Sequence, residues 1–287
     1  MRQIGFIGIG VMGSGMVHHL LKNGFAVSVY TRTKAKAEGV LAEGAVWCED
    51  IASCVKGKEA VITMVGYPED VEQVYFGEDG ILNHAATGTI LIDMTTTSPK
   101  LSKRIYDAAR KKGLFALDAP VSGGDIGAKN GTLSIMVGGD EAIFETCGEL
   151  FRAMGTTILY EGGCGSGQHV KMANQIALAG AISGVCEAIA YTKRAGIDVN
   201  RMLQTVGGGA AGSWQMEHLG PKIAVGDDAP GFFIKHFIKD MKIALAESEE
   251  NGFTPEMLKT VLSLYETLAA EGYGELGTQA LIRYYEK

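Results

Sequence analysis

The sequence lacks the cysteine and histidine spacings from which proteins build metal sites. Five cysteines are scattered through 287 residues, with no CxxC pair and no histidine at ligand spacing. Dispersed cysteines in a chain of this size are typical of reduced thiols in a reducing compartment, so we expect incidental or structural cysteines and no bound metal. They are Cys48, Cys54, Cys147, Cys164 and Cys186.

Excess basic charge and long apolar runs are also missing. The formal net charge is −7, whereas a nucleic-acid-binding surface needs clustered Lys and Arg. No apolar run reaches the roughly 20 residues that a membrane-spanning helix requires. Met1–Gln3 leads straight into an apolar strand, without the basic and apolar regions of a signal peptide. We therefore expect a cytoplasmic protein that binds neither nucleic acid nor a membrane.

Short apolar strands alternate with helices through the first half of the chain. Continuous apolar strands separated by amphipathic helices are typical of a parallel sheet that is covered on both faces. The predicted strands are residues 4–9, 26–30, 60–64, 90–93 and 115–118, and the predicted helices are residues 13–23, 33–43 and 100–112.

The strand pattern stops near residue 160, and the remainder is predicted to be helical. Ser166–Arg194 has the composition of one long helix that joins the two halves. In a later helix, Thr254 is expected as the N-cap and Pro255 as the first helical residue. The chain is thus predicted to have an α/β domain, residues 1–163, and an all-α domain, residues 164–287. The further helices are expected at 199–206, 238–251, 254–271 and near Thr278.

A glycine fingerprint lies between the first strand and the first helix. The segment Gly8–Gly13 reads GxGxxG, which is weak alone but strong in a strand–turn–helix context. Gly8 permits the tight turn, Gly10 lets a pyrophosphate approach the helix N-terminus, and Gly13 lets helix and strand pack closely. A glycine-rich turn without a dinucleotide is the alternative. We therefore predict a Rossmann-type dinucleotide-binding domain whose contacts include Gly8, Ile9, Gly10, Val11, Met12 and Gly13.

The end of the second strand distinguishes NAD from NADP. An NAD-preferring site usually carries Asp or Glu there, to bind the ribose 2′-hydroxyl. This chain instead has Thr31, Arg32 and Thr33, with Lys36 close behind. We expect no carboxylate that would repel a 2′-phosphate, and Arg32 can pair with one. NADP(H) is the preferred cofactor and NAD(H) a possible one, unless these cations are simply solvated.

Two further segments carry polar groups suited to acid–base chemistry. Ser122-Gly123-Gly124 offers a hydroxyl and bare backbone N–H groups that suit a carboxylate, although it could be an ordinary turn. Lys171, Asn174 and Gln175 share one face of the long helix. A ketone reduction needs an acid at the carbonyl oxygen, and desolvation can tune lysine for that task. A lysine at the helix surface is the alternative.

Four segments together resemble the β-hydroxyacid dehydrogenase family, which includes 3-hydroxyisobutyrate dehydrogenase, tartronate semialdehyde reductase and glyoxylate/succinic semialdehyde reductase. The segments are Gly8–Gly13, Asp93–Thr96, Asp118–Gly124 and Gly165–Gln175. The resemblance covers nearly the whole chain and keeps the order of the motifs. It implies a Rossmann-type domain, an all-α domain, no metal, and hydride transfer between a nicotinamide cofactor and a small hydroxy acid.

The resemblance also implies individual roles. Ser122, Gly123 and Gly124 would hold the substrate carboxylate, and Lys171 would be the general acid in reduction and the general base in oxidation. Asp240 would lie near Lys171, and Phe232 would line the pocket. The remaining cofactor contacts would be Val65, Thr96, which lies near the nicotinamide, and Lys239, which lies over the cofactor.

Two departures from the family pattern leave questions open. Many members have Asn where this chain has Gln175, so either Asn174 or Gln175 could hold the substrate hydroxyl. The family often has Asp where this chain has Gly277, which puts contacts from the last helix in doubt. Trp214 could contact substrate or cofactor, or could be an ordinary packing aromatic.

Three functions from different classes compete on the sequence. The first is a hydroxyacid dehydrogenase acting on glyoxylate or a small semialdehyde, as a homodimer or homotetramer. The second is an imine reductase-like NADPH enzyme, against which Lys171 and Ser122 argue because imine reductases generally lack the lysine. The third is a non-catalytic dehydrogenase-like binding protein, which should have lost the proton carrier.

Overall fold

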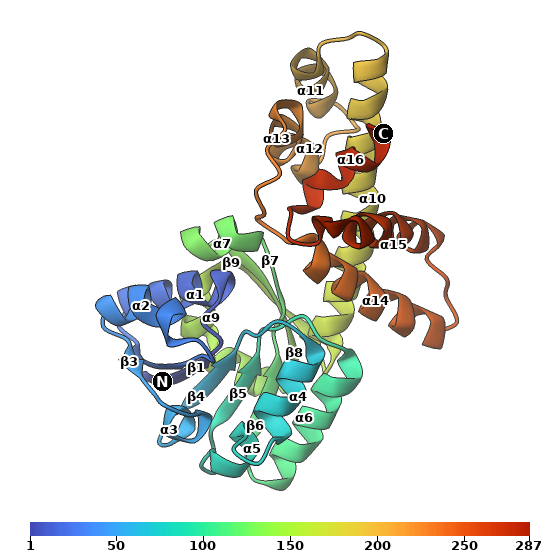
Figure 1. Ribbon diagram of the computed structural model, residues 1–287. Coiled ribbons are helices and arrows are strands. Elements are labelled where there is room, and N and C mark those ends of the chain that lie inside the picture. The colour runs from blue at the N-terminus through green and yellow to red at the C-terminus, as the bar shows by residue number, and fades with distance from the viewer. The chain divides into compact units, whose positions relative to one another are not determined.

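The computed structural model describes all 287 residues, and these form two compact units, Met1–Lys171 and Met172–Lys287 (Figure 1). The boundary falls inside the long helix α10 (Ser166–Arg194). The start of α10, through Lys171, therefore packs with the first unit, and the rest of this helix packs with the second.

The first unit is built on one sheet of nine strands. The first six are β1 (Gln3–Ile7), β2 (Ala26–Tyr30), β3 (Val46–Trp47), β4 (Ala60–Thr63), β5 (Ile90–Asp93) and β6 (Phe115–Asp118). They run parallel in the spatial order β3-β2-β1-β4-β5-β6. This order reverses between β1 and β4, which is where dinucleotides bind in open α/β sheets.

Three more strands extend the sheet beyond β6. They are β7 (Val121–Ser122), β8 (Leu133–Gly139) and β9 (Gly155–Gly162). Strand β8 runs antiparallel to β6 and to β7, and parallel to β9. The turn after β6 therefore doubles back along the sheet edge and brings Ser122 beside Ser134 of β8.

Helices cover both faces of the parallel strands because successive strand residues point to opposite sides. In β4, Ile62 enters one core and Val61 enters the other. The first face packs against α1 (Val11–Lys22), α2 (Glu38–Ala42), α7 (Gly124–Asn130), α8 (Glu141–Thr146) and α9 (Gly148–Met154), and the second against α3 (Ile51–Val55), α4 (Pro68–Phe76), α5 (Ile81–His84) and α6 (Pro99–Lys111).

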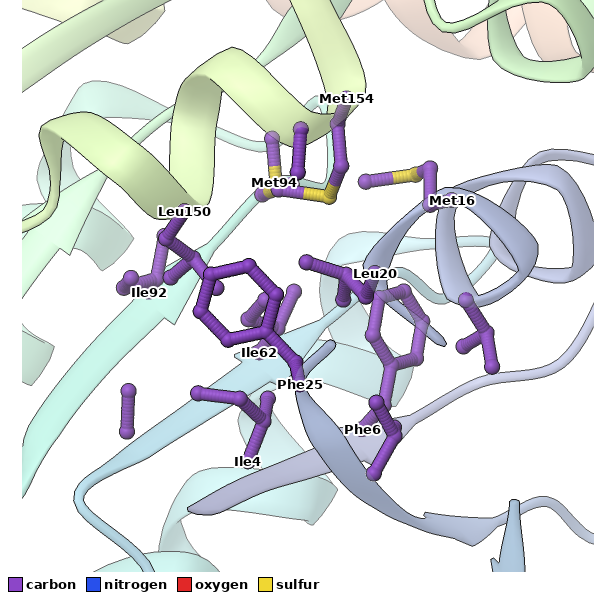
Figure 2. Packing of buried hydrophobic residues seen from close by; sticks show 14 of the residues in the cluster. Ile4, Phe6, Met16, Leu20, Phe25, Ile62, Ile92, Met94, Leu150 and Met154 are labelled. Atoms are coloured by element: carbon purple, nitrogen blue, oxygen red, sulfur yellow. The ribbon is translucent and has the colours of Figure 1, made fainter. Parts of the chain in front are cut away.

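Figure 2 shows the core on the first of these faces. Phe6 and Ile62 rise from neighbouring strands, and Leu20 of α1 and Leu150 of α9 close over them, all essentially without solvent exposure. Each fully buried side chain of this size contributes about 1.5–3 kcal/mol relative to exposure. The core therefore fixes α1, and with it the glycine turn that precedes the helix.

The second unit consists of helices packed around the later turns of α10. Its members are α11 (Val199–Gly207), α12 (Trp214–His218), α13 (Gly220–Val225), α14 (Ile234–Glu250), α15 (Glu256–Leu268), a π-type turn (Ala269–Tyr273), a 3₁₀ helix (Thr278–Leu281) and α16 (Ile282–Tyr285). At its centre the rings of Phe237 and Tyr265 meet edge to face, with 5.2 Å between centroids. The Tyr265 hydroxyl donates to the carbonyl of Thr278 at 2.7 Å, which satisfies its buried polar end.

Helix α10 is long and apolar enough to cross a membrane by length and composition, a property that we did not expect from the sequence. Its most apolar window is 44% buried inside the protein. A core helix passes the same test, and Ile182, Val185 and Ile189 of α10 belong to the core of the second unit. The match is therefore weak support for a membrane span.

The predicted fold class is confirmed: a Rossmann-type domain precedes an all-α domain, and α10 links them. Three predicted strands (26–30, 90–93 and 115–118) have the predicted bounds, as does α10. The predicted helix 33–43 is instead a 3₁₀ helix, Lys34–Ala37, followed by α2. The predicted start of α15 was wrong, because Pro255 has ψ 88° and is the N-cap, so that the helix begins at Glu256.

Asp93 is a buried carboxyl at the carboxyl end of β5. Thr63 Oγ1 and the backbone N–H of Thr95 donate to its Oδ1 at 2.8 and 3.1 Å, and its Oδ2 accepts no hydrogen bond. Burial is the main cause that raises the pKa of Asp93 to about 6, although the hydrogen bonds lower it. Above that pH the protein carries a poorly compensated buried charge.

This charge predicts a pH-dependent effect of Asp93→Asn on stability. The folded state binds the proton more tightly than the unfolded chain, so this group's contribution falls as pH rises from about 4 to about 6, by roughly 3 kcal/mol. Asparagine cannot ionise, so the variant should gain about that much relative to the parent between pH 4 and pH 7, measured by urea unfolding.

Asp50→Asn is the matched control, with the opposite sign. The side-chain and backbone hydrogen bonds from Ser53 lower the pKa of Asp50. Asp50→Asn should therefore lose stability relative to the parent as pH rises through the acidic range. An Asp93→Asn difference that does not change between the two pH values would contradict a buried, ionising Asp93.

Candidate functional site

The glycine turn follows β1, and two of its glycines are required by the fold. Gly8 has φ +104°, and a Cβ there would lie 2.2 Å from the carbonyl oxygen of Met64. A Cβ at Gly13 would lie 2.1 Å from the carbonyl oxygen of Gly8. Both positions therefore need glycine so that α1 can pack closely on β1 and β4.

Gly10 differs, because nothing in the chain lies within 4 Å of the position of its missing Cβ. It is the N-cap of α1 with extended backbone (φ −100°) and supplies no side-chain cap. The exposed Val11 follows it. The first turn of α1 thus presents backbone N–H groups and the positive end of the helix to open space, which suits a pyrophosphate. The residues present fit a dinucleotide.

Arg32, just beyond β2, has a partner that the sequence did not predict. Its Nη1 lies 3.0 Å from Oδ1 of Asp70 in the first turn of α4. The Asp70 side chain is largely buried and also accepts from the backbone N–H of Tyr67, whereas the Arg32 side chain is 76% exposed. The expectation that no carboxylate lies near Arg32 is therefore wrong. An anion that binds Arg32 must share it with Asp70 or displace Asp70. Thr31 is half-buried, and Thr33 and Lys36 are exposed.

Two loops at the carboxyl ends of β4 and β5 are joined by Thr95. Its hydroxyl accepts from the backbone N–H of Val65 at 3.0 Å, and it is buried. Thr97 is also buried, whereas Thr96 between them is partly exposed. The two candidate cofactor contacts, Val65 and Thr96, therefore lie on loops that hold each other in place.

Lys171 lies against the Ser122 segment, although 50 residues separate them. The Lys171 side chain is buried, with the residue 6% exposed, and its Nζ donates to the carbonyl oxygen of Val121 at 2.8 Å. Ser122 follows directly, and Gly123 and Gly124 have φ +123° and +62°, values that favour glycine. The structure therefore brings an ammonium group, a hydroxyl and two glycine amides into one neighbourhood.

Two residues that we did not predict from the sequence, Asp118 and Gln168, anchor the start of α10, the helix that carries Lys171. Asp118 accepts from the backbone N–H groups of Gly165 and Gln168 at 2.7 and 2.9 Å, and so caps the start of α10. Gln168 is fully buried; its Oε1 accepts from the N–H of Thr97 at 3.0 Å and its Nε2 donates to the carbonyl of Thr95 at 2.7 Å. Asp118 and Gln168 lie within the motif segments Asp118–Gly124 and Gly165–Gln175. Those motifs are therefore the sequence signal from which the two residues could have been identified.

In the second unit, four polar side chains are linked in a row by hydrogen bonds and an ion pair. Asn174 Nδ2 donates to Gln175 Oε1 at 2.7 Å, and Gln175 Nε2 donates to Asp240 Oδ2 at 2.5 Å. The ammonium of Lys239 lies 2.9 Å from Asp240 Oδ1. Gln175 and Asp240 are buried, whereas Asn174 is partly exposed. The amide of Gln175 is thus engaged at both ends within the protein.

Phe232 and Trp214, the other candidate site residues of the second unit, make ring contacts outside this set of four side chains. Phe232 is partly buried, with its ring centroid 5.5 Å from that of Phe237. Trp214 begins α12, is 47% exposed, and stacks on His218 at 4.4 Å. A Cβ at Gly277 would lie 2.3 Å from the Gln279 side chain, so an Asp there would force Gln279 to move.

Family models match the chain almost from end to end. One, described as the NAD binding domain of 6-phosphogluconate dehydrogenase, matches residues 3–162. Another, described as NAD-binding of NADP-dependent 3-hydroxyisobutyrate dehydrogenase, matches residues 165–285. The chain belongs to the 3-hydroxyisobutyrate dehydrogenase family. The resemblance to β-hydroxyacid dehydrogenases is thereby confirmed.

Individual members of this family are similar over their full length. The chain is 52% identical over 286 residues to an uncharacterized oxidoreductase of Bacillus subtilis, with 100% of this chain and 99% of the relative covered. It is 38% identical over 284 residues to the 2-hydroxy-3-oxopropionate reductase of Escherichia coli, covering 99% and 97%. The crystal structure of a 3-hydroxyisobutyrate dehydrogenase from Salmonella typhimurium matches with a TM-score of 0.90, 28% identity and 99% of each chain. This 3-hydroxyisobutyrate dehydrogenase family member is an NAD(P)-dependent oxidoreductase of the β-hydroxyacid dehydrogenase type.

The glycine turn yields a prediction that separates folding from binding. Gly10→Ala should leave the melting temperature near that of the parent, because its Cβ meets nothing, yet should weaken NADPH binding in a fluorescence titration. Gly13→Ala should lower stability by about 1–3 kcal/mol, the usual range for overpacking. Parental NADPH affinity in Gly10→Ala, or parental stability in Gly13→Ala, would contradict these assignments.

Proposed function

We propose that the protein transfers a hydride between NADP(H) and a small aldehyde or keto acid, giving the hydroxy acid, with Lys171 as general acid and base. The observation that carries this proposal is the buried Lys171 ammonium beside the Ser122 segment, with Nζ 2.8 Å from Val121 O. The substrate class is a short acid with a reducible carbonyl: glyoxylate, succinic semialdehyde, tartronate semialdehyde or methylmalonate semialdehyde.

The proposed cofactor-binding residues fall into three groups, one for each part of the dinucleotide. When bound, the nicotinamide supplies the hydride in reduction and accepts it in oxidation. Gly8, Ile9, Gly10, Val11, Met12 and Gly13 hold the pyrophosphate at the N-terminus of α1. Thr31, Arg32, Thr33 and Lys36 bind the adenosine end, where Arg32 pairs with the 2′-phosphate and gives the preference for NADP(H). Val65, Thr96 and Lys239 contact the nicotinamide end.

Ser122, Gly123 and Gly124 bind the substrate carboxylate. A hydroxyl and two glycine amides give charge-assisted hydrogen bonds, which are stronger than neutral ones. Because these substrates are short, the reducible carbonyl then lies close to Lys171. Its ammonium protonates the forming alkoxide in reduction, and its amine takes the hydroxyl proton in oxidation.

Asn174 is the better candidate for holding the substrate hydroxyl. Gln175 already accepts from Asn174 and donates to Asp240, so its amide has both ends engaged. Its role is to orient Asn174, while Asp240 acts through Gln175 and balances the charge of Lys239. Phe232 and Trp214 remain candidate substrate contacts on the second unit. The Escherichia coli relative is named a 2-hydroxy-3-oxopropionate reductase, which supports a semialdehyde substrate here.

Lys171→Ala tests the proton carrier. It should lower kcat by about 10²- to 10⁴-fold, the usual contribution of a positioned acid or base, while the Kd for NADPH stays near the parent's. Lys242→Ala is the matched control, because Lys242 is exposed and pairs with Glu266 on the protein surface. Near-parental turnover of Lys171→Ala would refute the assigned role.

Arg32→Asp tests the cofactor preference. The change replaces a cation by an anion at the proposed 2′-phosphate contact, so it should weaken NADPH binding far more than NADH binding. Arg104→Asp is the control, since Arg104 pairs with Glu72 of α4, the helix that also carries Asp70, the partner of Arg32. Equal losses for NADPH and NADH in titrations of Arg32→Asp would remove the basis for the preference.

A further inference from the structure

Gln168 makes a two-sided bridge between a loop and a helix. Its side chain binds the backbone of Thr95 and of Thr97, on either side of Thr96, and its own backbone N–H donates to Asp118. One residue therefore ties the loop after β5 to the first turn of α10. Nothing in the general chemistry of the reaction requires a glutamine there.

Lys171 follows Gln168 by three residues on the same helix. Residues at i and i+3 are neighbours on a helix face, so the Gln168 bridge and the Lys171 side chain share one side of α10. A shift of α10 by one residue moves a side chain about 1.5 Å along the axis. Because Gln168 is clamped to the loop, the distance between Thr96 and the start of α10 is fixed in this unit.

The chemistry of the amide fits this task better than packing alone. A buried amide costs free energy unless its groups are bonded, and an apolar side chain would fill the same space without that risk. Gln168 instead offers an acceptor to one backbone N–H and a donor to one backbone carbonyl, at 3.0 and 2.7 Å. The match is specific to an uncharged side chain that donates and accepts.

We propose that Gln168 is a positioning residue, which holds Lys171 at the correct separation from the Thr95–Thr97 loop. The proposal rests on the roles proposed above for Thr96 and Lys171. Gln168 touches neither substrate nor cofactor in this account. It acts through the placement of Lys171 against the loop beside the reacting carbon.

Gln168→Glu should make the hydrogen bonds between the loop and α10 depend on pH. A protonated Glu can still accept from Thr97 and donate to Thr95, whereas a carboxylate cannot donate and would face the Thr95 carbonyl. Burial raises the pKa of such a group. The kcat of this variant, relative to the parent, should therefore be near parental at low pH and fall as pH rises through the raised pKa.

Gln168→Met removes both hydrogen bonds at similar volume. It should lower kcat by about 10- to 100-fold, as small misplacements of reacting groups do, with less change in KM. In the protein without cofactor, the Thr97 amide should exchange with deuterium faster than in the parent, because its acceptor is gone. This second readout does not depend on turnover.

Gln279→Met is the matched control. Gln279 is also a buried glutamine, and its Nε2 donates to the carbonyls of Asp227 and Ala229 at 3.0 Å each, within the second unit. It should lower the melting temperature comparably while kcat stays close to the parent's. If Gln168→Met behaves in the same way, with lost stability but parental kcat, Gln168 is structural only and the proposal falls.

A double-mutant cycle separates this proposal from the proposed function. If Gln168 acts through Lys171, Gln168→Met should slow the Lys171→Ala variant little further, because coupled residues are non-additive. Fully additive losses would overturn the positioning role while leaving Lys171 as the proton carrier. Near-parental kcat of Lys171→Ala alone would refute the proposed function and the positioning role resting on it, whereas faster Thr97 exchange would still establish the bridge.

Discussion

The buried carboxylate of Asp118 is the interaction on which the candidate site depends most. It receives two backbone N–H groups from the start of α10, where the helix dipole also favours a negative charge. Burial raises the pKa of Asp118 and these hydrogen bonds lower it. The close approach requires glycine on both sides: a Cβ at Gly138 or Gly167 would lie 2.6 or 2.9 Å from the Asp118 carboxylate oxygens. Sheet and helix thus meet at one carboxyl group, and Lys171 lies within two turns of it.

The remaining polar residues follow from the topology of the sheet. Parallel strands deliver their carboxyl ends to one edge, so the segments after β1, β4, β5 and β6 converge there. Gly8, Val65 and Thr96 follow β1, β4 and β5, and Asp118 is the last residue of β6. Strand β7, antiparallel to β8, then returns Ser122 to the same region. There Lys171 donates to the carbonyl oxygen of Val121, the residue before Ser122. A fold determined by the pattern of apolar residues therefore assembles a polar site that no single segment contains.

Much of this could be predicted from the sequence, because the informative patterns are local. Apolar runs and turn residues gave the parallel strands and α10, and the glycine fingerprint gave the first helix with its turn. The strands β7, β8 and β9 were not predicted, since their pairing depends on strands distant in the sequence. The pairing of Arg32 with Asp70 was missed for the same reason, as 38 positions and five elements separate them. Asn174 and Gln175 could not be told apart because Asp240, 65 residues later, determines how the Gln175 amide is used.

We propose that this chain reduces small aldehyde acids by binding their carboxylate beside a buried lysine. The most direct measurement follows NADPH consumption with glyoxylate and the small semialdehyde acids, with aldehydes of the same length that lack the carboxylate, and with cyclic imines. We expect turnover of one or more aldehyde acids and far slower turnover of the neutral aldehydes and the imines. Preferential reduction of imines, or equal turnover with and without the carboxylate, would contradict it.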